Sequence, residues 1–413
     1  MRKVSFIVVG AGSRGNAYAK YVKAFPDEGE IIAVCEPRDD VRNDYADTYN
    51  IPENMRFRDW RDILDKPKLA EAAIICTQDA DHRDPAVALA GMGYHLMLEK
   101  PMAPTPEDCK IIYDAVIKSG VMLAVCHVLR YTPFNRKLKE MIDSGIIGKV
   151  HNIQLLEPVG YWHQAHSYVR GNWRNEKMSS FMLLAKSCHD IDLLNYFIPS
   201  KCTAVSSFGS LSYFTRANQP QGASDRCAEC SIEPKCPYSA FKIYIRDITH
   251  FDRWPVNVVT RGGTPEAVKL ALKDGPYGRC VFACDNDVVD HQVVNMEFGG
   301  GETAGFTMTA FNLSGGRETY VMGDQGTLRC IDQGIEHADF LTEKKTMVEL
   351  DMGDGQITTG HGGGDFGLMK SFLSAVREDD PSRITSGPDI SLESHLIVFA
   401  AERARRSKTV ETL

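Results

Sequence analysis

The feature that most constrains the fold is a regular alternation of short apolar runs and helix-forming segments in the first part of the chain. The apolar runs are five or six residues long and lie at 4–9, 31–35, 72–76, 94–98 and 121–126. Nearly continuous apolar character over that length is typical of strands buried on both faces of a parallel sheet. Helices are predicted between them, at 14–25, 41–49, 83–90 and 106–119. The alternation predicts a doubly wound parallel sheet, an α/β fold.

The pattern changes after Arg130. Strands are predicted at 151–156, 203–208, 292–298, 304–311, 319–322 and 327–330, and helices at 133–144, 365–377 and 390–406. The segments 215–240 and 352–364 are rich in Gly, Pro and Cys and are predicted to be irregular. A chain of 413 residues is too long for one ordinary core. The second half therefore predicts a separate, sheet-based domain with helices at its borders.

Charge and cysteine content exclude several classes of protein. The net charge is −8, which argues against nucleic-acid and anionic-membrane partners, because both need a basic surface. The N-terminal apolar run is too short for a signal-peptide core, and no later stretch approaches the ~18 apolar residues of a membrane span. Without an export signal, most of the 12 cysteines are expected to be reduced thiols. We expect a cytoplasmic protein with no nucleic-acid or membrane partner.

A glycine-rich turn follows the first apolar run, with Gly10, Gly12 and Gly15 in the spacing G-x-G-x-x-G. A helix follows this turn, and Glu36 ends the second apolar run. In a dinucleotide site the glycines permit the tight turn, the approach of the pyrophosphate and the packing of helix on strand. The helix N-terminus then supplies free N–H groups for the phosphates. The alternative is a flavodoxin-like or methyltransferase sheet in which the glycines serve geometry alone.

The cofactor preference depends on one acid and two arginines. Glu36 favours NAD, because a carboxylate there accepts hydrogen bonds from the adenosine ribose hydroxyls. Arg14 and Arg38 leave NADP open, since either side chain can pair with a 2′-phosphate.

Several motifs further along resemble the glucose–fructose oxidoreductase/inositol dehydrogenase (Gfo/Idh/MocA) family. The Glu99-Lys100-Pro101 sequence at a strand end resembles the EKP of that family. Other matching segments are 77–82 (TP-x-x-x-H, with Gln78 in place of Pro), 130–133 (R-[FY]-x-P), 145–148 (G-x-[IL]-G) and 189–192 (H-x-x-D). The matches span essentially the whole chain.

The resemblance implies a Rossmann dinucleotide-binding domain at 1–128 and a second α/β domain at 129–413 for substrate binding and oligomerisation. The second domain would contain a large open, mostly antiparallel sheet, through which many members form homodimers or homotetramers. The implied activity is NAD(P)-dependent oxidation or reduction of a secondary alcohol on a sugar, cyclitol or related substrate. One alternative is redox-neutral glycoside cleavage or epimerisation through transient oxidation of a ring carbinol. Another is a non-catalytic dinucleotide sensor.

Three residues are predicted to carry the chemistry: Lys100, His189 and Lys186. Lys100 lies at the strand end nearest the nicotinamide, where the resemblance implies substrate orientation and proton relay. His189 is the candidate general acid/base, because imidazole exchanges a proton near neutral pH, and Asp192 shares its helix face. Many relatives carry an Asp four residues before this histidine, whereas this chain has Ala185. Lys186 is therefore predicted to replace the missing group and to lose its proton readily.

Two further groups of residues are assigned from motif position and residue type. The cofactor residues are predicted to be Gly10, Gly12, Ser13, Arg14, Gly15, Glu36, Arg38, Thr77, His82, Glu99 and Lys100. The substrate residues are predicted to be Arg130, Tyr161, Trp162, His163, His166, Arg170, Trp173, Arg174 and Asp192. Aromatic faces and polar donors suit a polyhydroxylated substrate, although core packing is the alternative for the aromatic side chains.

A cysteine cluster lies within the irregular segment. Cys227, Cys230 and Cys236 have a spacing that suits a structural zinc ion, with a fourth ligand from elsewhere in the chain. Reduced thiols that pack a loop, or a local disulfide, are the alternatives.

Overall fold

The computed structural model describes residues 2–246, 248–313, 316–331, 334–350 and 361–413. The N-terminal part contains a parallel sheet of order β3-β2-β1-β4-β5-β6. Its strands are β1 (Val4–Val9), β2 (Gly29–Cys35), β3 (Arg56–Phe57), β4 (Ala72–Ile75), β5 (His95–Leu98) and β6 (Leu123–Val125). Its helices are α1 (Ser13–Ala24), α2 (Asp39–Thr48), α3 (Arg83–Gly91) and α4 (Pro106–Ser119). This strand order confirms the predicted Rossmann fold.

The second sheet has nine strands in the order β14-β13-β12-β11-β7-β10-β9-β8-β15. Only β7 and β10 are paired in parallel, so the sheet is mostly antiparallel, as predicted. The strands are β7 (Val150–Pro158), β8 (Cys202–Ser210), β9 (His291–Phe298), β10 (Thr303–Thr309), β11 (Glu318–Gly323), β12 (Gly326–Ile331), β13 (Gly334–Asp339), β14 (Lys345–Glu349) and β15 (Glu411–Thr412).

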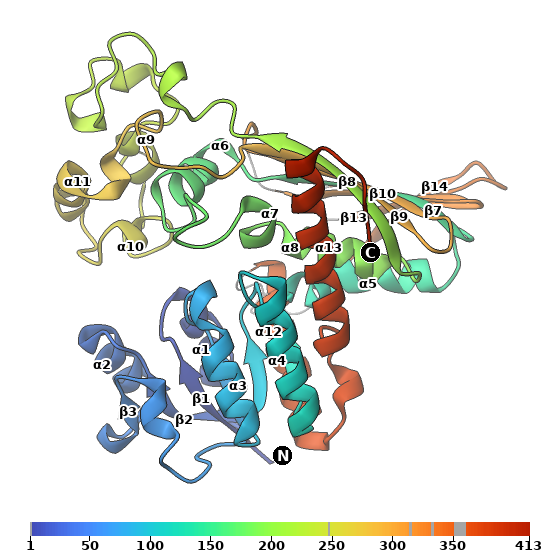
Figure 1. Cartoon of the computed structure of the whole chain (residues 1–413), viewed down its shortest axis with the longest axis horizontal. Helices are drawn as coiled ribbons and strands as arrows, with labels where there is room; N and C mark the ends of the chain where they lie inside the picture. Colours follow the sequence, from blue (N-terminus) through green and yellow to red (C-terminus); the bar gives the residue numbers. More distant parts are fainter. Residues whose placement is uncertain (1, 247, 314–315, 332–333, 351–360) are drawn as a thin grey trace.

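The remaining helices border this sheet and connect it to the first domain. They are α5 (Pro133–Asp143), α6 (Tyr161–His163), a π-helix η5 (Gln164–Arg170), α7 (Met182–Ala185), α8 (Cys188–Phe197), α9 (Ala240–Tyr244), α10 (Val256–Val259), α11 (Pro265–Asp274), α12 (Gly364–Glu378) and α13 (Pro388–Ser407). The short 3₁₀ turns are η1 (Glu53–Met55), η2 (Trp60–Ile63), η3 (Asp79–Asp81), η4 (Val128–Tyr131), η6 (Arg216–Asn218), η7 (Cys227–Glu229), η8 (Glu233–Lys235), η9 (Pro276–Gly278), η10 (His361–Gly363) and η11 (Pro381–Arg383). Helices α9, α10 and α11 form a lobe at the end of the molecule opposite β14 (Figure 1).

The C-terminal helices return to the first domain. Phe372 of α12 packs 6.4 Å from Phe6 of β1, measured between ring centroids. Two glycines allow α12 to approach η4: a Cβ on Gly364 would lie 2.3 Å from the Val128 carbonyl oxygen, and one on Gly367 2.4 Å from that of Tyr131. Helix α13 contacts α4, α8 and β8. The start of α12 is therefore fixed at the carboxyl edge of the Rossmann sheet.

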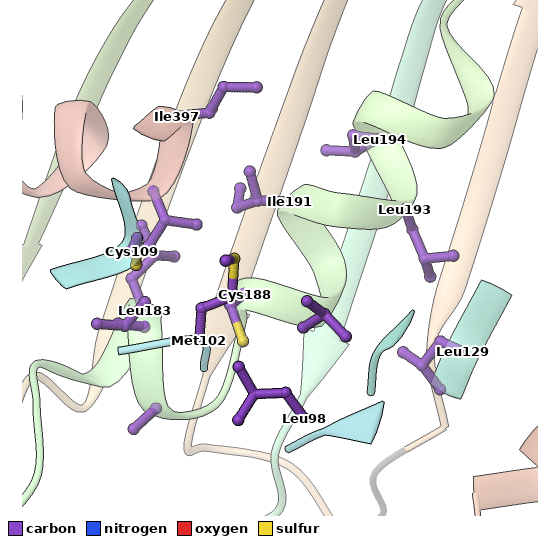
Figure 2. Packing of buried hydrophobic residues seen from close by; sticks show 14 of the residues in the cluster. Leu98, Met102, Cys109, Leu129, Leu183, Cys188, Ile191, Leu193, Leu194 and Ile397 are labelled. Atoms are coloured by element: carbon purple, nitrogen blue, oxygen red, sulfur yellow. The ribbon is translucent and has the colours of Figure 1, made fainter. Parts of the chain in front are cut away.

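The two sheets share a hydrophobic cluster. Leu98, at the end of β5, and Met102, just after it, belong to the same buried cluster as Cys188 and Ile191 of α8 (Figure 2). Ile397 of α13 joins them (Figure 2). This shared packing fixes the end of β5 against α7 and α8. The domain boundary at 128/129 stays a prediction.

Several elements differ from their prediction or lie outside it. The 215–240 segment contains only short 3₁₀ turns before α9, as its composition predicts. Strands β13 and β14 and helices α9 to α11 had no clear pattern in the sequence. Most of the 352–364 segment lies outside the described residues. Among the described helices, none has the length and apolar character needed to span a membrane.

Candidate active site

The glycine turn after β1 has the geometry that a dinucleotide requires. Gly10 has a φ of +94°, and a Cβ there would lie 2.5 Å from the carbonyl oxygen of Cys76. A Cβ on Gly15 would lie 2.2 Å from the Gly10 carbonyl oxygen, so helix α1 packs directly on the turn. At Gly12 the nearest atom to an added Cβ is the Arg38 guanidinium, 3.9 Å away. The turn is tightly packed at Gly10 and Gly15 and leaves free space at Gly12, where a pyrophosphate would approach.

Glu36 lies buried at the end of β2, beside this turn. Its carboxylate accepts a hydrogen bond from the Ala11 N–H at 3.1 Å and from Arg38 Nε and Nη2 at 2.7 and 2.9 Å. Burial alone would raise the pKa of Glu36, but the hydrogen bonds from Arg38 and the Arg38 charge outweigh it, so the pKa is lowered. The carboxylate is ionised at neutral pH, and its charge is paired with Arg38.

Arg14 is held by acidic side chains. Its guanidinium pairs with Glu99 at 2.5 Å and with Asp365 at 2.7 Å, and it donates a hydrogen bond to the Tyr18 hydroxyl. Glu99 also accepts hydrogen bonds from the Tyr18 hydroxyl at 2.7 Å and from the Lys100 N–H at 2.8 Å. Arg14, on α1, therefore links this helix to the end of β5 through Glu99 and to α12 through Asp365. Its predicted pairing with a 2′-phosphate does not agree with this geometry.

His82 and Thr77 shape a neighbouring loop. The His82 ring is fully buried, with Nδ1 2.8 Å from the Pro101 carbonyl oxygen and Nε2 3.3 Å from that of Thr77. The Thr77 hydroxyl donates to the Asp81 carbonyl at 3.1 Å. His82 was predicted to bind the cofactor, but its burial makes it a link between the loops after β4 and β5. Thr77 remains partly exposed at the sheet edge.

Lys100 extends from the end of β5 to the second domain. Its Nζ donates a hydrogen bond to the carbonyl oxygen of Ala185, at the end of α7, over 2.7 Å. The carbonyl oxygens of α7 are available there because the helix ends at this residue. The main chain of Ala185 thus contacts the lysine where a carboxylate stands in relatives. This contact places Lys100 between the two domains.

His189 lies on α8 close to Lys100. The imidazole is 5% exposed, and its Nδ1 has no hydrogen-bond partner among the described residues. Burial, and next the positive charge of Lys100, lower the pKa of His189 well below its usual value. The ring is therefore neutral at neutral pH. It can take part in hydrogen bonds, but it does not readily accept a second proton.

Lys186 belongs to a buried ionic network that the sequence did not reveal. Its Nζ lies 3.1 Å from Glu157 Oε1, and Arg317 pairs with Glu157 at 2.9 Å and with Asp190 at 2.6 Å. Burial lowers the pKa of Lys186 although Glu157 opposes the shift, which is the predicted direction. Burial also raises the pKa of Asp190 to about 6. Lys186 therefore has its own carboxylate partner beside the site.

Asp192 does not orient His189 as predicted. Its carboxylate accepts hydrogen bonds from Arg130 Nε at 2.6 Å, Arg130 Nη2 at 2.8 Å and the Ser394 hydroxyl at 2.8 Å. All three side chains are almost completely buried. Arg130 and Asp192 were both predicted to bind substrate. They instead form an internal ion pair that ties η4 to α8 and α13.

Two family models match this chain. One, described as an oxidoreductase family NAD-binding Rossmann fold, matches residues 4–127, and the other, its C-terminal alpha/beta domain, matches residues 139–386. The chain belongs to the Gfo/Idh/MocA oxidoreductase family. It is an NAD(P)-dependent oxidoreductase, and the resemblance inferred from its motifs is confirmed.

Individual relatives are distant but match over most of the chain. The putative oxidoreductase YteT of Bacillus subtilis is 24% identical over 373 residues, covering 83% of this chain and 79% of that protein. The 2,7-anhydro-N-acetylneuraminate hydratase of Mediterraneibacter gnavus is 22% identical over 274 residues, covering 66% and 69%. A solved levoglucosan dehydrogenase in complex with NADH and levoglucosan aligns with a TM-score of 0.72 at 17% identity, over 100% of this chain and 99% of that one.

The aromatic segment after β7 divides into residues at the site and residues in the core. Tyr161, Trp162 and His163 are partly exposed. Trp162 packs against His163 and Trp254, with ring centroids 5.7 and 5.2 Å away. Burial, and next the charge of Lys186, lower the pKa of His163. These side chains lie nearest the charged groups of the site, where their predicted contact with substrate stays open.

The remaining members of the segment have structural partners. His166 is buried, with Nδ1 2.9 Å from the Tyr244 hydroxyl. Arg170 is buried and donates to the carbonyls of Arg279 and Tyr238 at 2.7 and 2.8 Å. Arg174 pairs with Asp285 at 2.8 Å. Their prediction as substrate residues does not agree with these contacts, while Trp173 is exposed beside Tyr168.

The cysteine cluster lines a small cavity next to Arg170. Cys227, Cys230, Cys236 and Cys280 all border it. Within the described residues, however, no three His, Cys, Asp or Glu side chains are arranged to hold a metal ion. Cys227 Sγ instead accepts a hydrogen bond from the Ala240 N–H at 3.4 Å. The zinc prediction thus has no structural support, and the thiols pack the loop, as the alternative held.

Sequence reasoning missed two histidines beside His189. His127 is fully buried, its ring centroid is 6.0 Å from that of His189, and neither of its nitrogens has a hydrogen-bond partner among the described residues. His361 lies on the other side, with ring centroids 6.1 Å apart. The only local signal for His361 was the glycine run that follows it.

Proposed function

We propose that this chain catalyses NAD-dependent oxidation or reduction of a secondary alcohol on a sugar, cyclitol or sugar-derived substrate. The observation that carries the proposal is the position of Lys100. Its ammonium group follows the carboxyl end of β5, donates a hydrogen bond to the Ala185 carbonyl oxygen and is close enough to His189 for its charge to lower the pKa of that imidazole. In Rossmann folds, ligands bind outside the carboxyl ends of the strands.

The residues around the glycine turn fit a nicotinamide dinucleotide, which when bound supplies the hydride acceptor or donor. The ionised Glu36 suits the two ribose hydroxyls of NAD. A 2′-phosphate would face this carboxylate, and the charge of Arg38 is already paired with Glu36. These contacts support NAD over NADP as the working cofactor.

The chain's own residues then orient the substrate and handle its proton. Lys100 can donate a hydrogen bond to the substrate hydroxyl oxygen and stabilise negative charge that develops on it. The neutral His189 can accept or donate a second hydrogen bond through its unpartnered Nδ1. The levoglucosan bound in the structurally similar dehydrogenase supports a carbohydrate-like substrate.

The test is a turnover assay over a panel of sugars, anhydrosugars and cyclitols. We expect NADH to accumulate at 340 nm with at least one of them, and mass spectrometry of the denatured protein to identify NAD. Lys100→Met is expected to lower kcat at least about 100-fold, the usual effect of removing a donor that stabilises negative charge developing on the substrate oxygen. Lys20→Met, on the exposed face of α1, is the matched control. Full kcat in Lys100→Met would refute the role of this lysine.

A second candidate function is redox-neutral. Ala185 replaces the acid of relatives, and one relative over two thirds of the chain is named as a hydratase. In this reading the substrate is oxidised transiently, a neighbouring C–H is acidified, and the cofactor is regenerated. Substrate consumption without NADH, with deuterium entering the product from D₂O, would favour it. The sensor alternative requires NAD binding without turnover of any substrate.

A further inference from the structure

An Asp–His pair lies at the edge of the site and has no role in the chemistry described above. Asp365 Oδ1 is 3.1 Å from Nδ1 of His361. The Asp365 side chain is 2% exposed, whereas that of His361 is 40% exposed. The ring centroid of His361 lies 6.1 Å from that of His189, and the charges of both Lys100 and His361 act on His189.

The backbone holds His361 in an unfavourable conformation. His361 has a φ of +44°, and Gly362 and Gly363 continue the left-handed turn with φ values of +61° and +88°. A left-handed backbone is unfavourable for a non-glycine residue and persists only where the surroundings impose it. Here the close contact of Gly364 with η4 and the pairing of Asp365 with Arg14 impose it. Such a residue is a reason to look for function.

The three residues predicted to carry the chemistry each have a contact or a pKa shift that works against holding the proton of the substrate hydroxyl, and Asp190 is paired with Arg317. The acid of relatives is replaced by Ala185, and Lys100 is bound to a carbonyl oxygen instead. His189 is neutral, because burial and Lys100 lower its pKa. Lys186 has Glu157 as its partner. Proton transfer is most efficient when the acceptor is protonated and deprotonated with similar ease at the working pH.

His361 differs from these residues in its carboxylate partner and in its exposure. A carboxylate on Nδ1 fixes the tautomer and stabilises the imidazolium, as in an Asp–His–nucleophile triad. Nε2 then carries the free lone pair, and it has no hydrogen-bond partner among the described residues. Because the ring is partly exposed, a proton accepted there can pass to water.

We propose that His361, positioned by Asp365, is the acid–base residue of this oxidoreductase. In the oxidation direction the carbinol C–H leaves as hydride to NAD, and the hydroxyl proton passes to Nε2 of His361. The C–O bond becomes C=O, and the proton is released to water, so that one alcohol and NAD⁺ give one carbonyl, NADH and H⁺. The reverse sequence applies to reduction. This role rests on the proposed function.

Charged groups on four elements face His361. They are the carboxylates of Asp365 on α12 and Glu157 on β7, the guanidinium of Arg14 on α1, which lies 3.5 Å from Nδ1, and the ring of His189 on α8. The pH dependence of kcat therefore reflects all of these groups together. The contribution of His361 is the difference between the profiles of the wild type and of His361→Gln.

The test compares His361→Gln, His361→Gly and Asp365→Asn with the wild type. His151→Gln is the matched control, since His151 is an exposed histidine of β7 whose ring faces Asp324. Kcat is measured from pH 5.5 to 9 with the substrate found in the panel, and the Kd of NAD is measured by fluorescence titration. Glycine tolerates the left-handed backbone at 361 and leaves space for added imidazole.

We expect His361→Gln to lower kcat at least about 100-fold and to flatten its pH dependence, with the Kd of NAD changed less than twofold. Added imidazole should restore activity to His361→Gly, which a purely structural role would not allow. Asp365→Asn should lower kcat less than His361→Gln does. Full kcat in His361→Gln, or a weaker Kd with unchanged kcat, would overturn the proposal while leaving the proposed function intact. Wild-type protein that turns over no alcohol would overturn both.

Discussion

Mutation of Asp192 tests whether this residue of the H-x-x-D motif binds substrate or stabilises the fold through its ion pair with Arg130. Its carboxylate accepts two hydrogen bonds from Arg130 and one from Ser394, all at 2.8 Å or less and all buried. In Asp192→Asn the amide keeps the shape, but the guanidinium of Arg130 loses its counter-charge inside the protein. Removing one partner of a buried ion pair costs about 3 to 5 kcal/mol, because the remaining charge stays desolvated.

The assay is differential scanning calorimetry together with steady-state kinetics. With an unfolding entropy of about 2.1 cal/mol/K per residue, 1 kcal/mol shifts the Tm of a chain of 413 residues by roughly 1 °C, so the loss corresponds to a fall in Tm of about 3 to 6 °C. Asp114→Asn is the control, because it breaks an exposed i,i+4 pair with Lys110 worth at most about 0.5 kcal/mol. An unchanged Tm combined with a raised KM would show that Asp192 contacts substrate and that the structural reading is wrong.

Three further predictions concern cofactor choice, acid stability and assembly. Glu36→Gln should reduce the preference for NAD over NADP at least about tenfold in fluorescence titrations, since the mutation removes the carboxylate and frees Arg38; an unchanged ratio would contradict this. Burial lowers the pKa of His127 to about 3, so its contribution to stability is present above the unfolded value of about 6.5 and is lost as the pH falls toward 3. His127→Leu should therefore make Tm fall less steeply between pH 7 and 4 than in the wild type or in the exposed control His250→Gln. The predicted homo-oligomer should dissociate in light scattering when Phe208→Lys places a charge on the sheet face, where Phe208 and its paired neighbour Val293 are exposed.

Local patterns predicted the elements of the first domain because those elements depend on local chemistry. The helix at 106–119 illustrates this: the Thr105 hydroxyl accepts from the Asp108 N–H, Pro106 occupies the first turn, and Gly120 ends the helix with a φ of +65°. The glycine turn was equally readable, since Gly10 and Gly15 lie against neighbouring backbone that excludes a Cβ, and Gly12 leaves the turn open. Strand β14 was missed because four of its five side chains are exposed and leave no apolar alternation.

The partners of the site residues were not predictable, because they come from the distant parts of the chain. Arg14 was predicted to bind a phosphate, yet it pairs with Asp365, 351 positions away. Arg130 and Asp192 both lie in motifs that suggest substrate contact, and only the packing of η4 against α8 shows that they neutralise each other. Motif position places a residue on an element, but its role depends on which other element packs there.

Ala185 shows how this bears on function. When a motif lacks its acid, the nearest charged neighbour in sequence is the obvious substitute, and Lys186 was predicted on that ground. The structure gives Lys186 a partner of its own, Glu157, whose second oxygen is also bound by Arg317. The carboxylate that remains next to an exchangeable proton is Asp365, which reaches the site from α12. Loops from distant parts of the chain meet at the carboxyl edge of a parallel sheet. A residue that replaces a lost catalytic group is therefore better identified by its position at that edge than by its nearness in sequence.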